Sequence, residues 1–184
     1  MSNWRPTFCP EHLYFVTTKA AQYAHVFRRD IIKRLLLDTL DCMRHQGRFR
    51  LFSFVIMPNH VHFIIQSPAE HTIADAIRDF KHTTSDRLVR QLEAESNSSA
   101  LAFLALNVTR PSRQHHRVWE EGYNAKDVFS PDFLREKMAY IHNNPCQPHW
   151  NLSETPEAYI WSSARFYLSD ARCIIPVDDA RDLL

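Results

Sequence analysis

Glycine is the residue that this sequence uses least. Its 184 residues include two glycines, Gly47 and Gly122, which lie far apart. A GxGxxG dinucleotide-binding fingerprint and a P-loop each need glycines a few residues apart, because the backbone must turn tightly around phosphate groups. The sequence therefore excludes Rossmann-type cofactor binding and Walker-type ATPase chemistry.

Cysteines are also few, and none forms a CxxC pair. Paired cysteines would indicate a disulfide framework or a zinc knuckle, whereas scattered ones are typical of reduced thiols that pack as small apolar side chains. The four residues are Cys9, Cys42, Cys146 and Cys173. We assign no chemistry to them.

Long apolar runs and an excess of one charge are absent as well. The longest apolar stretches, 54–57 and 100–106, are far shorter than the roughly 18 residues that span a membrane. Residues 1–12 resemble neither a signal peptide nor a transit peptide, so we expect a cytoplasmic protein with no membrane partner. Because 22 Lys and Arg residues face 21 Asp and Glu residues, contacts with nucleic-acid phosphates must come from local basic patches.

Composition and length together indicate a single folded domain. Hydrophobic residues make up 45% and charged residues 23% of the chain, which is typical of a globular protein rather than a disordered one. A chain of 184 residues suits one hydrophobic core. We expect one domain over 1–184, with its core at about 13–145 and a C-terminal extension over 146–184.

Hydrophobic periodicity, capping residues and turn signals predict the order of helices and strands. The predicted segments are a strand at 13–18, a helix at 27–45, strands at 49–57 and 60–66, a helix from Thr72 to about 95, a strand at 118–123 and a helix from Ser130 to Pro145. Residues 100–108 fit either a helix or a strand, and 178–184 are expected to form a loose tail.

This order predicts an α+β protein with a ferredoxin-like βαββαβ antiparallel sheet. The helix that begins at Ser130 is additional to that core and carries Tyr140. An exposed edge strand of such a sheet permits a homodimer as well as a monomer.

Two histidines on the third predicted strand are the first candidates for chemistry. Successive strand residues point to opposite faces, so His60 and His62 share one face and Val61 points to the other. Same-face neighbours lie about 6.5 to 7 Å apart, close enough for two imidazoles to bind one divalent metal. Alternatively, they are two of 11 histidines on a half-exposed face. Longer motifs of the HxHxDH and HxHxH types are excluded because Ile64 follows.

The last core helix supplies a second pair of candidates. Tyr140 and Asn144 lie four residues apart, so a phenol and an amide share one helix face. Each also has an ordinary structural interpretation, Tyr140 as an amphipathic core residue and Asn144 as a helix-terminal residue before Pro145.

Three motifs taken together resemble a known family. They read FVIMPNHVHF at 54–63, YIHNNP at 140–145 and YIWSS at 159–163. Their order and spacing, over about 14–167, are similar to the REP-associated tyrosine transposases, which belong to the single-tyrosine HUH transposases of small insertion sequences. One departure is the segment after Pro145, which reads CQPHW where relatives often have a basic stretch with glycine.

The resemblance implies a metal-dependent single-stranded DNA endonuclease and strand transferase that acts on hairpin-forming DNA. In it, His60 and His62 would hold Mg²⁺ or Mn²⁺, and Asn144 would be a third ligand. Tyr140 would be the nucleophile, forming a 5′-phosphotyrosyl link and leaving a free 3′-OH. We read Trp161-Ser162-Ser163 as structural, packing the C-terminal segment onto the core.

Three groups of basic residues could contact DNA. The first two are Arg28, Arg29, Lys33 and Arg34, and Arg78, Lys81, Arg87 and Arg90; the third is Arg110, Arg113, His115, His116 and Arg117. We favour the third group, together with Lys81, which we also expect to reach the active site from its helix. Two alternatives stay open: a domesticated, noncatalytic nucleic-acid-binding protein, and a phosphoesterase that uses metal-activated water.

Overall fold

The computed structural model describes residues 8–10, 12–109 and 115–184. Its strands are β1 (Leu13–Lys19), β2 (Arg50–Ile56), β3 (His60–Gln66) and β4 (Asn124–Val128). Its α-helices are α1 (Asp30–His45), α2 (Ile73–Ala94), α3 (Ser98–Leu106), α4 (Pro131–Asn143) and α5 (Ala164–Ser169). Short 3₁₀ turns are η1 (Ala21–Tyr23), η2 (Asn144–Cys146), η3 (Pro156–Ala158) and η4 (Arg181–Leu183). No helix among these residues is long and apolar enough to cross a membrane.

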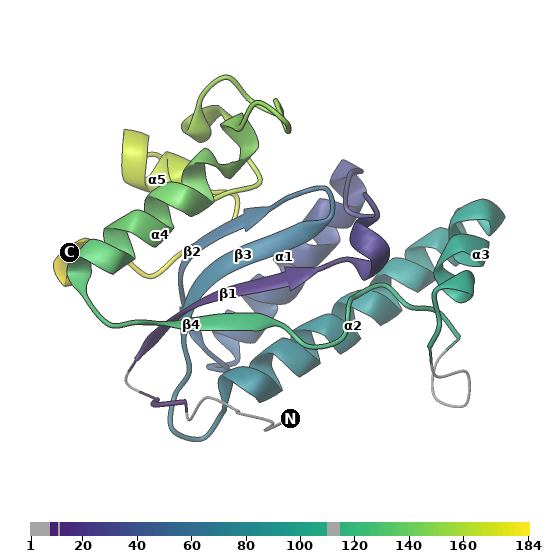
Figure 1. Cartoon of the computed structure of the whole chain (residues 1–184), viewed down its shortest axis with the longest axis horizontal. Coiled ribbons are helices and arrows are strands. Elements are labelled where there is room, and N and C mark those ends of the chain that lie inside the picture. Colours follow the sequence, from purple (N-terminus) through teal and green to yellow (C-terminus); the bar gives the residue numbers. More distant parts are fainter. Residues whose placement is uncertain (1–7, 11, 110–114) are drawn as a thin grey trace.

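The four strands form one antiparallel sheet in the order β2-β3-β1-β4. Strands β1 and β3 lie at its centre, and β4 is an edge strand (Figure 1). With α1 and α2 as the connecting helices, this is the arrangement of a ferredoxin-like fold. The predicted α+β class and its βαββαβ order are therefore confirmed.

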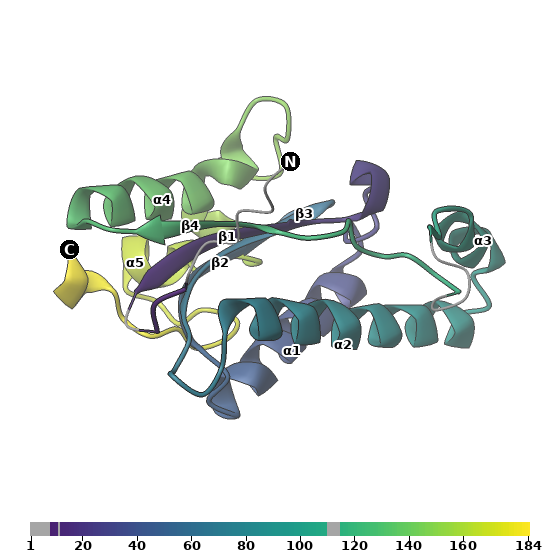
Figure 2. The same ribbon diagram turned by 60° about the horizontal axis from the view of Figure 1, so that its bottom comes forward.

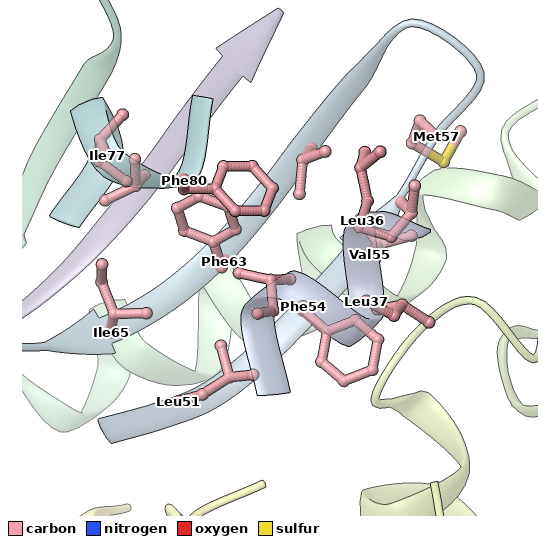
Figure 3. Packing of buried hydrophobic residues seen from close by; sticks show 14 of the residues in the cluster. Leu36, Leu37, Leu51, Phe54, Val55, Met57, Phe63, Ile65, Ile77 and Phe80 are labelled. Carbon is pink, nitrogen blue, oxygen red and sulfur yellow. The ribbon is translucent and has the colours of Figure 1, made fainter. Parts of the chain in front are cut away.

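The helices cover the two faces of the sheet unequally. Figure 2 shows α1 and α2 on one face and α4 on the other. The main core lies between the sheet and the α1–α2 layer, where Phe54, Phe63 and Phe80 are almost completely buried (Figure 3). Helix α4 contacts β2, β3 and β4 from the opposite side. Any side chain that points away from the main core on β3 therefore faces α4.

The predicted fourth strand was placed too early in the chain. The two apolar residues that begin the predicted strand, Val118 and Trp119, are buried, and the Trp119 ring centroid lies 5.7 Å from that of Phe80. Gly122 then takes a positive φ of 69°, which turns the chain. The real strand, β4, is the polar segment Asn124–Val128, as an edge strand that faces solvent can be.

The C-terminal extension is tied to the core along its length. The Ile56 N–H donates to the Trp161 carbonyl over 2.9 Å, and Ser163 N–H donates to the Phe54 carbonyl over 3.0 Å. The structural interpretation of Trp161-Ser162-Ser163 is thus confirmed. The expected loose tail at 178–184 is wrong, because the Asp178 N–H donates to the Leu51 carbonyl over 2.7 Å and Ala180 is fully buried.

The ambiguous stretch at 100–108 is mostly helix. Helix α3 begins after Asn97, whose side chain caps it by accepting a hydrogen bond from the Ala100 N–H. It packs against α2 at the far end of the molecule from α4 (Figure 1).

Candidate active site

Strand β3 places two imidazoles side by side on the face covered by α4. Val61 and Phe63 point into the main core and are fully or almost fully buried. His60 and His62 point the other way, and their ring centroids are 4.6 Å apart. The alternation expected from the sequence therefore brings the two side chains together.

One nitrogen of the His62 ring is hydrogen-bonded, and the other has no partner among the described residues. Its Nδ1 lies 2.8 Å from the Thr17 hydroxyl on the neighbouring strand β1. Its Nε2 is buried and has no hydrogen-bond partner within the part of the chain that the structure describes. Burial lowers the pKa of His62 well below its usual value, and the charge of Lys19 lowers it further. His62 is therefore a neutral imidazole near pH 7.

His60 has a defined tautomer, set by Asn59. The Asn59 amide nitrogen donates to the Tyr23 carbonyl over 3.0 Å, so its oxygen is the atom that faces His60 Nδ1 at 2.6 Å. Because that oxygen can only accept, Nδ1 carries the proton and Nε2 keeps its lone pair. Burial lowers the pKa of His60 to about 4, opposed in part by the nearby Asn144 amide.

Helix α4 brings the tyrosine and the asparagine to the same place. Ser130 caps its first turn by accepting from the Phe133 N–H over 3.2 Å. In the last turn, Tyr140 is 49% exposed and its ring centroid lies 5.2 Å from that of His62. Asn144 follows as a buried residue, and its side-chain oxygen has no hydrogen-bond partner among the described residues.

These groups fit a divalent cation. Two buried polar atoms, His62 Nε2 and Asn144 Oδ1, lack the partner that buried polar atoms normally have among the described residues. Imidazole nitrogen and amide oxygen are both metal ligands, and the bonds from Thr17 and Asn59 are of the kind that orient ligating histidines. The described residues contain no group of three or more His, Cys, Asp or Glu side chains that could hold a metal, so the amide is needed to complete this set.

Beside Tyr140 lies a cavity of about 370 Å³ whose lining is basic. Its cations are Lys19 from β1, Lys126 from β4 and Lys137 from α4, and His62 and Tyr140 also line it. We did not predict these three lysines. Thr17 and Asn124 are paired across β1 and β4, and Lys19 and Lys126 each lie two residues further along these strands, on the same face of the sheet. Had β4 been placed correctly, this pairing would have predicted that both lysines face the site.

Two of the predicted DNA-binding residues, Lys81 and Arg117, do not line this cavity. Lys81 and Arg117 line a separate groove of about 740 Å³ between α2 and 115–121. The Lys81 ammonium donates to the Glu120 and Gly122 carbonyls over 2.5 and 2.7 Å and does not line the cavity beside Tyr140. Arg117 pairs with Glu120 at 2.6 Å. Arg110 and Arg113 lie outside the described residues.

A family model settles the relationship of this chain. The model described as "Transposase IS200 like" matches residues 9–144, which include His60, His62, Tyr140 and Asn144. The chain belongs to the IS200-like transposase family. No curated protein matches it.

Two solved structures are similar to this chain to different degrees. A REP-associated tyrosine transposase bound to a REP hairpin is similar to this family member over 100% of this chain and 94% of its own, with a TM-score of 0.61 at 15% identity. A putative transposase from Deinococcus radiodurans R1 is 20% identical over 78% of this chain and 97% of its own, with a TM-score of 0.47. The first of these likenesses shows a shared fold.

Proposed function

We propose that this IS200-like transposase is a metal-dependent single-stranded DNA endonuclease and strand transferase that works through a 5′-phosphotyrosine intermediate. One observation carries the proposal: an accessible tyrosine ring lies 5.2 Å from a buried histidine whose Nε2 has no partner among the described residues. A tyrosine that merely completed a core would be buried, whereas Tyr140 is half exposed and lines a basic cavity.

The covalent chemistry requires one nucleophile and no nucleotide cofactor. The Tyr140 oxygen forms a bond to the phosphorus, and the bond from phosphorus to the 3′ oxygen breaks. The phenolic proton leaves to solvent, and the departing 3′ oxygen takes up a proton. Attack by another 3′-OH on the phosphotyrosine reverses these steps and releases Tyr140, so the bond energy is conserved.

His60, His62 and Asn144 would hold Mg²⁺ or Mn²⁺, which supplies polarisation of the phosphate and neutralises its developing charge. The protein contributes the orientation of these ligands. Asn59 holds the His60 ring with its Nε2 lone pair available, and Thr17 holds the His62 ring at Nδ1, on the side away from Nε2. Burial keeps both imidazoles neutral, as a metal ligand must be, because it lowers the pKa of His60 to about 4 and lowers that of His62 as well.

The substrate we propose is a single strand next to a DNA hairpin, acted on in the cytoplasm. Support comes from the structural neighbour, which was solved bound to a REP hairpin. Lys19 and Lys126 provide cations for the strand's phosphates, whereas Lys137 already pairs with Glu136 at 2.6 Å. Because one chain supplies Tyr140 and both histidines, a monomer is sufficient to build the site.

The test is a labelled oligonucleotide assay on a denaturing protein gel. Hairpin oligonucleotides with single-stranded flanks carry a 3′ label, because the downstream fragment stays attached to the tyrosine. With Mn²⁺ or Mg²⁺, we expect a labelled adduct with the wild-type protein and none with Tyr140→Phe. Tyr23→Phe is the matched control, since Tyr23 is the other strongly exposed tyrosine of the described residues, at 59%, and should leave the adduct intact.

Two outcomes would contradict the proposal in different ways. Cleavage that persists in Tyr140→Phe would indicate a phosphoesterase that uses metal-activated water. Tight binding of the oligonucleotide without cleavage by the wild-type protein in either metal would indicate a noncatalytic nucleic-acid-binding protein.

A further inference from the structure

An indole stands next to the paired histidines, in the segment that follows α4 and η2. The Trp150 ring centroid lies 5.7 Å from that of His60. It lies 5.6 Å from the His25 ring and 5.5 Å from the His149 ring. Three imidazoles therefore surround one half-buried indole, and both His25 and His149 are exposed.

Backbone hydrogen bonds fix this cluster from two directions. The Trp150 and Asn151 N–H groups both donate to the Gln147 carbonyl, over 2.9 and 2.8 Å. Asn151 adopts a positive φ of 43°, which closes the turn. On the other side, the Phe27 N–H donates to the Pro58 carbonyl over 2.8 Å, so the loop that carries His25 is fastened to the turn before His60. The indole is thus held in place before any ligand arrives.

The rings continue into the active site. From Trp150 the contacts run to His60, then to His62 at 4.6 Å, then to Tyr140 at 5.2 Å. Lys19 is the strand partner of His60 on β1 and lines the same cavity as His62, so a cation lies beside this row. Aromatic rings next to cations are the means by which proteins hold unpaired DNA bases, since every base has a π-face.

We propose that Trp150, flanked by His25 and His149, stacks on an unpaired base of the DNA strand next to the phosphate that Tyr140 attacks. The inference rests on the proposed function and adds a substrate contact to it. The subsite binds a base through its face, so it positions the strand without reading the identity of that base. The neighbouring cations favour a nucleotide over an uncharged apolar ligand, because the phosphates accompany the base.

The test measures binding in a protein that cannot form the tyrosyl adduct. A hairpin oligonucleotide with a single-stranded flank is selected from a randomised library by binding to Tyr140→Phe protein. Abasic sites are then placed at each flank position in turn, and affinities are measured by fluorescence anisotropy. The same series is repeated with Trp150→Ala and Trp150→Phe added. Phe129→Ala serves as the control, because Phe129 is exposed at the opposite end of α4.

We expect one flank position where removal of the base weakens binding about tenfold, as for loss of one stacked base. Trp150→Ala should weaken binding to the intact strand to the same extent and abolish sensitivity to that abasic site. Trp150→Phe and Phe129→Ala should keep the sensitivity.

The inference is overturned if Trp150→Ala does not remove the sensitivity to an abasic site at any flank position. It is also overturned if Trp150→Ala lowers the affinity equally for every abasic strand. A cleavage assay with the same oligonucleotide and the wild-type protein tests the proposed function independently of this binding experiment. Coupling without cleavage would leave the stacking subsite standing and remove the nuclease proposal. Failure of the library to yield any binder would remove both.

Discussion

At the scale of single residues, the site depends on which nitrogen of each histidine carries a proton. Asn59 decides this for His60 because its amide nitrogen is already engaged by the Tyr23 carbonyl. The sequence placed Asn59 in a turn and the two histidines on one face, yet it could not show that the asparagine orients a ring. Such a contact depends on the loop at 20–27, which comes from a distant part of the chain.

Replacing Asn59 by alanine should weaken metal binding. Without the acceptor, the His60 ring loses its orientation, and loss of an orienting partner typically reduces metal affinity by about 10- to 100-fold. Isothermal titration with Mn²⁺ measures the change. Asn143→Ala is the control, since the exposed Asn143 amide donates only within its own helix, to the Ala139 carbonyl. Equal Mn²⁺ affinity in wild type and Asn59→Ala would contradict this role.

Three histidines, of which His62 and His142 are buried and His60 is half-buried, should make stability dependent on pH. Burial lowers the pKa of His142 and of His60 to about 4 from an unfolded value near 6.5, and lowers that of His62 too. Between these two pKa values the unfolded chain binds more protons than the folded chain. The free energy of unfolding therefore has its full value above pH 6.5 and decreases as the pH drops toward 4.

His142 alone should account for about 3 kcal/mol of that loss when the pH is taken well below 4. Urea unfolding in the presence of a chelator, at intervals from pH 7 to 4, measures the slope. In His142→Gln the slope should be shallower than in the wild type. A stability that is flat over this range, or that rises toward pH 4, would show that these imidazoles are not buried as neutral groups.

At the scale of elements, α4 is held by polar contacts as well as by packing. His142 Nε2 lies 2.9 Å from the Ser163 hydroxyl and 3.1 Å from the Ser53 hydroxyl. All three side chains are buried, and Ser163 also accepts a hydrogen bond from the Phe54 N–H. The C-terminal extension thereby fastens the helix that carries Tyr140 to strand β2.

Ser163→Ala should both destabilise the protein and slow adduct formation. Removing the hydroxyl leaves buried partners unsatisfied, at a cost of about 1–3 kcal/mol. Because α4 also loses a hydrogen bond that holds it on β2, Tyr140 should be positioned less precisely. The rate of adduct formation should then fall further than the loss of folded protein explains. Thermal melts and a time course of the labelled adduct measure the two effects. Ser169→Ala, at an exposed position in α5, should change neither. If the rate per folded molecule is unchanged in Ser163→Ala, these hydrogen bonds contribute to stability and not to the positioning of Tyr140.

The sequence predicted those helices and strands whose apolar residues recur at the spacing of their buried face. Strands β1 to β3 and helices α1, α2 and α4 carry strong periodicity or caps, and Thr72 and Ser130 both cap as expected. The fourth strand was misplaced because β4 is polar and exposed, whereas the apolar residues before it serve packing under α2. Lys126 was missed as part of the cavity lining for the same reason, since it lies on that strand.

At the scale of the whole molecule, a near-zero net charge coexists with a concentrated basic cavity. The formal charge is +1, yet Lys19, Lys126 and Lys137 converge beside Tyr140. Many other basic residues are paired, such as Arg29 with Glu95 at 2.5 Å and Arg34 with Asp38 at 2.9 Å. Within the cavity, Lys137 also pairs with Glu136 at 2.6 Å, so Lys19 and Lys126 are the cavity cations that we expect to meet phosphates.

Lys126→Ala should weaken binding to single-stranded DNA and make it less sensitive to salt. Each phosphate contact adds about 0.7 to the slope of log K against log salt for a single strand, so one lost contact should reduce the slope by about that amount. Anisotropy titrations from about 50 to 200 mM salt measure it. Arg34→Ala, on α1 at the other face of the sheet, should leave the slope unchanged. An unaltered slope in Lys126→Ala would place the DNA elsewhere.

The most direct test of the central claim is to locate the covalent bond. After reaction with a hairpin oligonucleotide and Mn²⁺, the adduct is digested with nuclease and protease and its modified peptide is sequenced by mass spectrometry. We expect the nucleotide phosphate on Tyr140 alone. A modified tyrosine at any other position, or cleaved DNA with every tyrosine unmodified, would contradict a site built from Tyr140 and the two histidines.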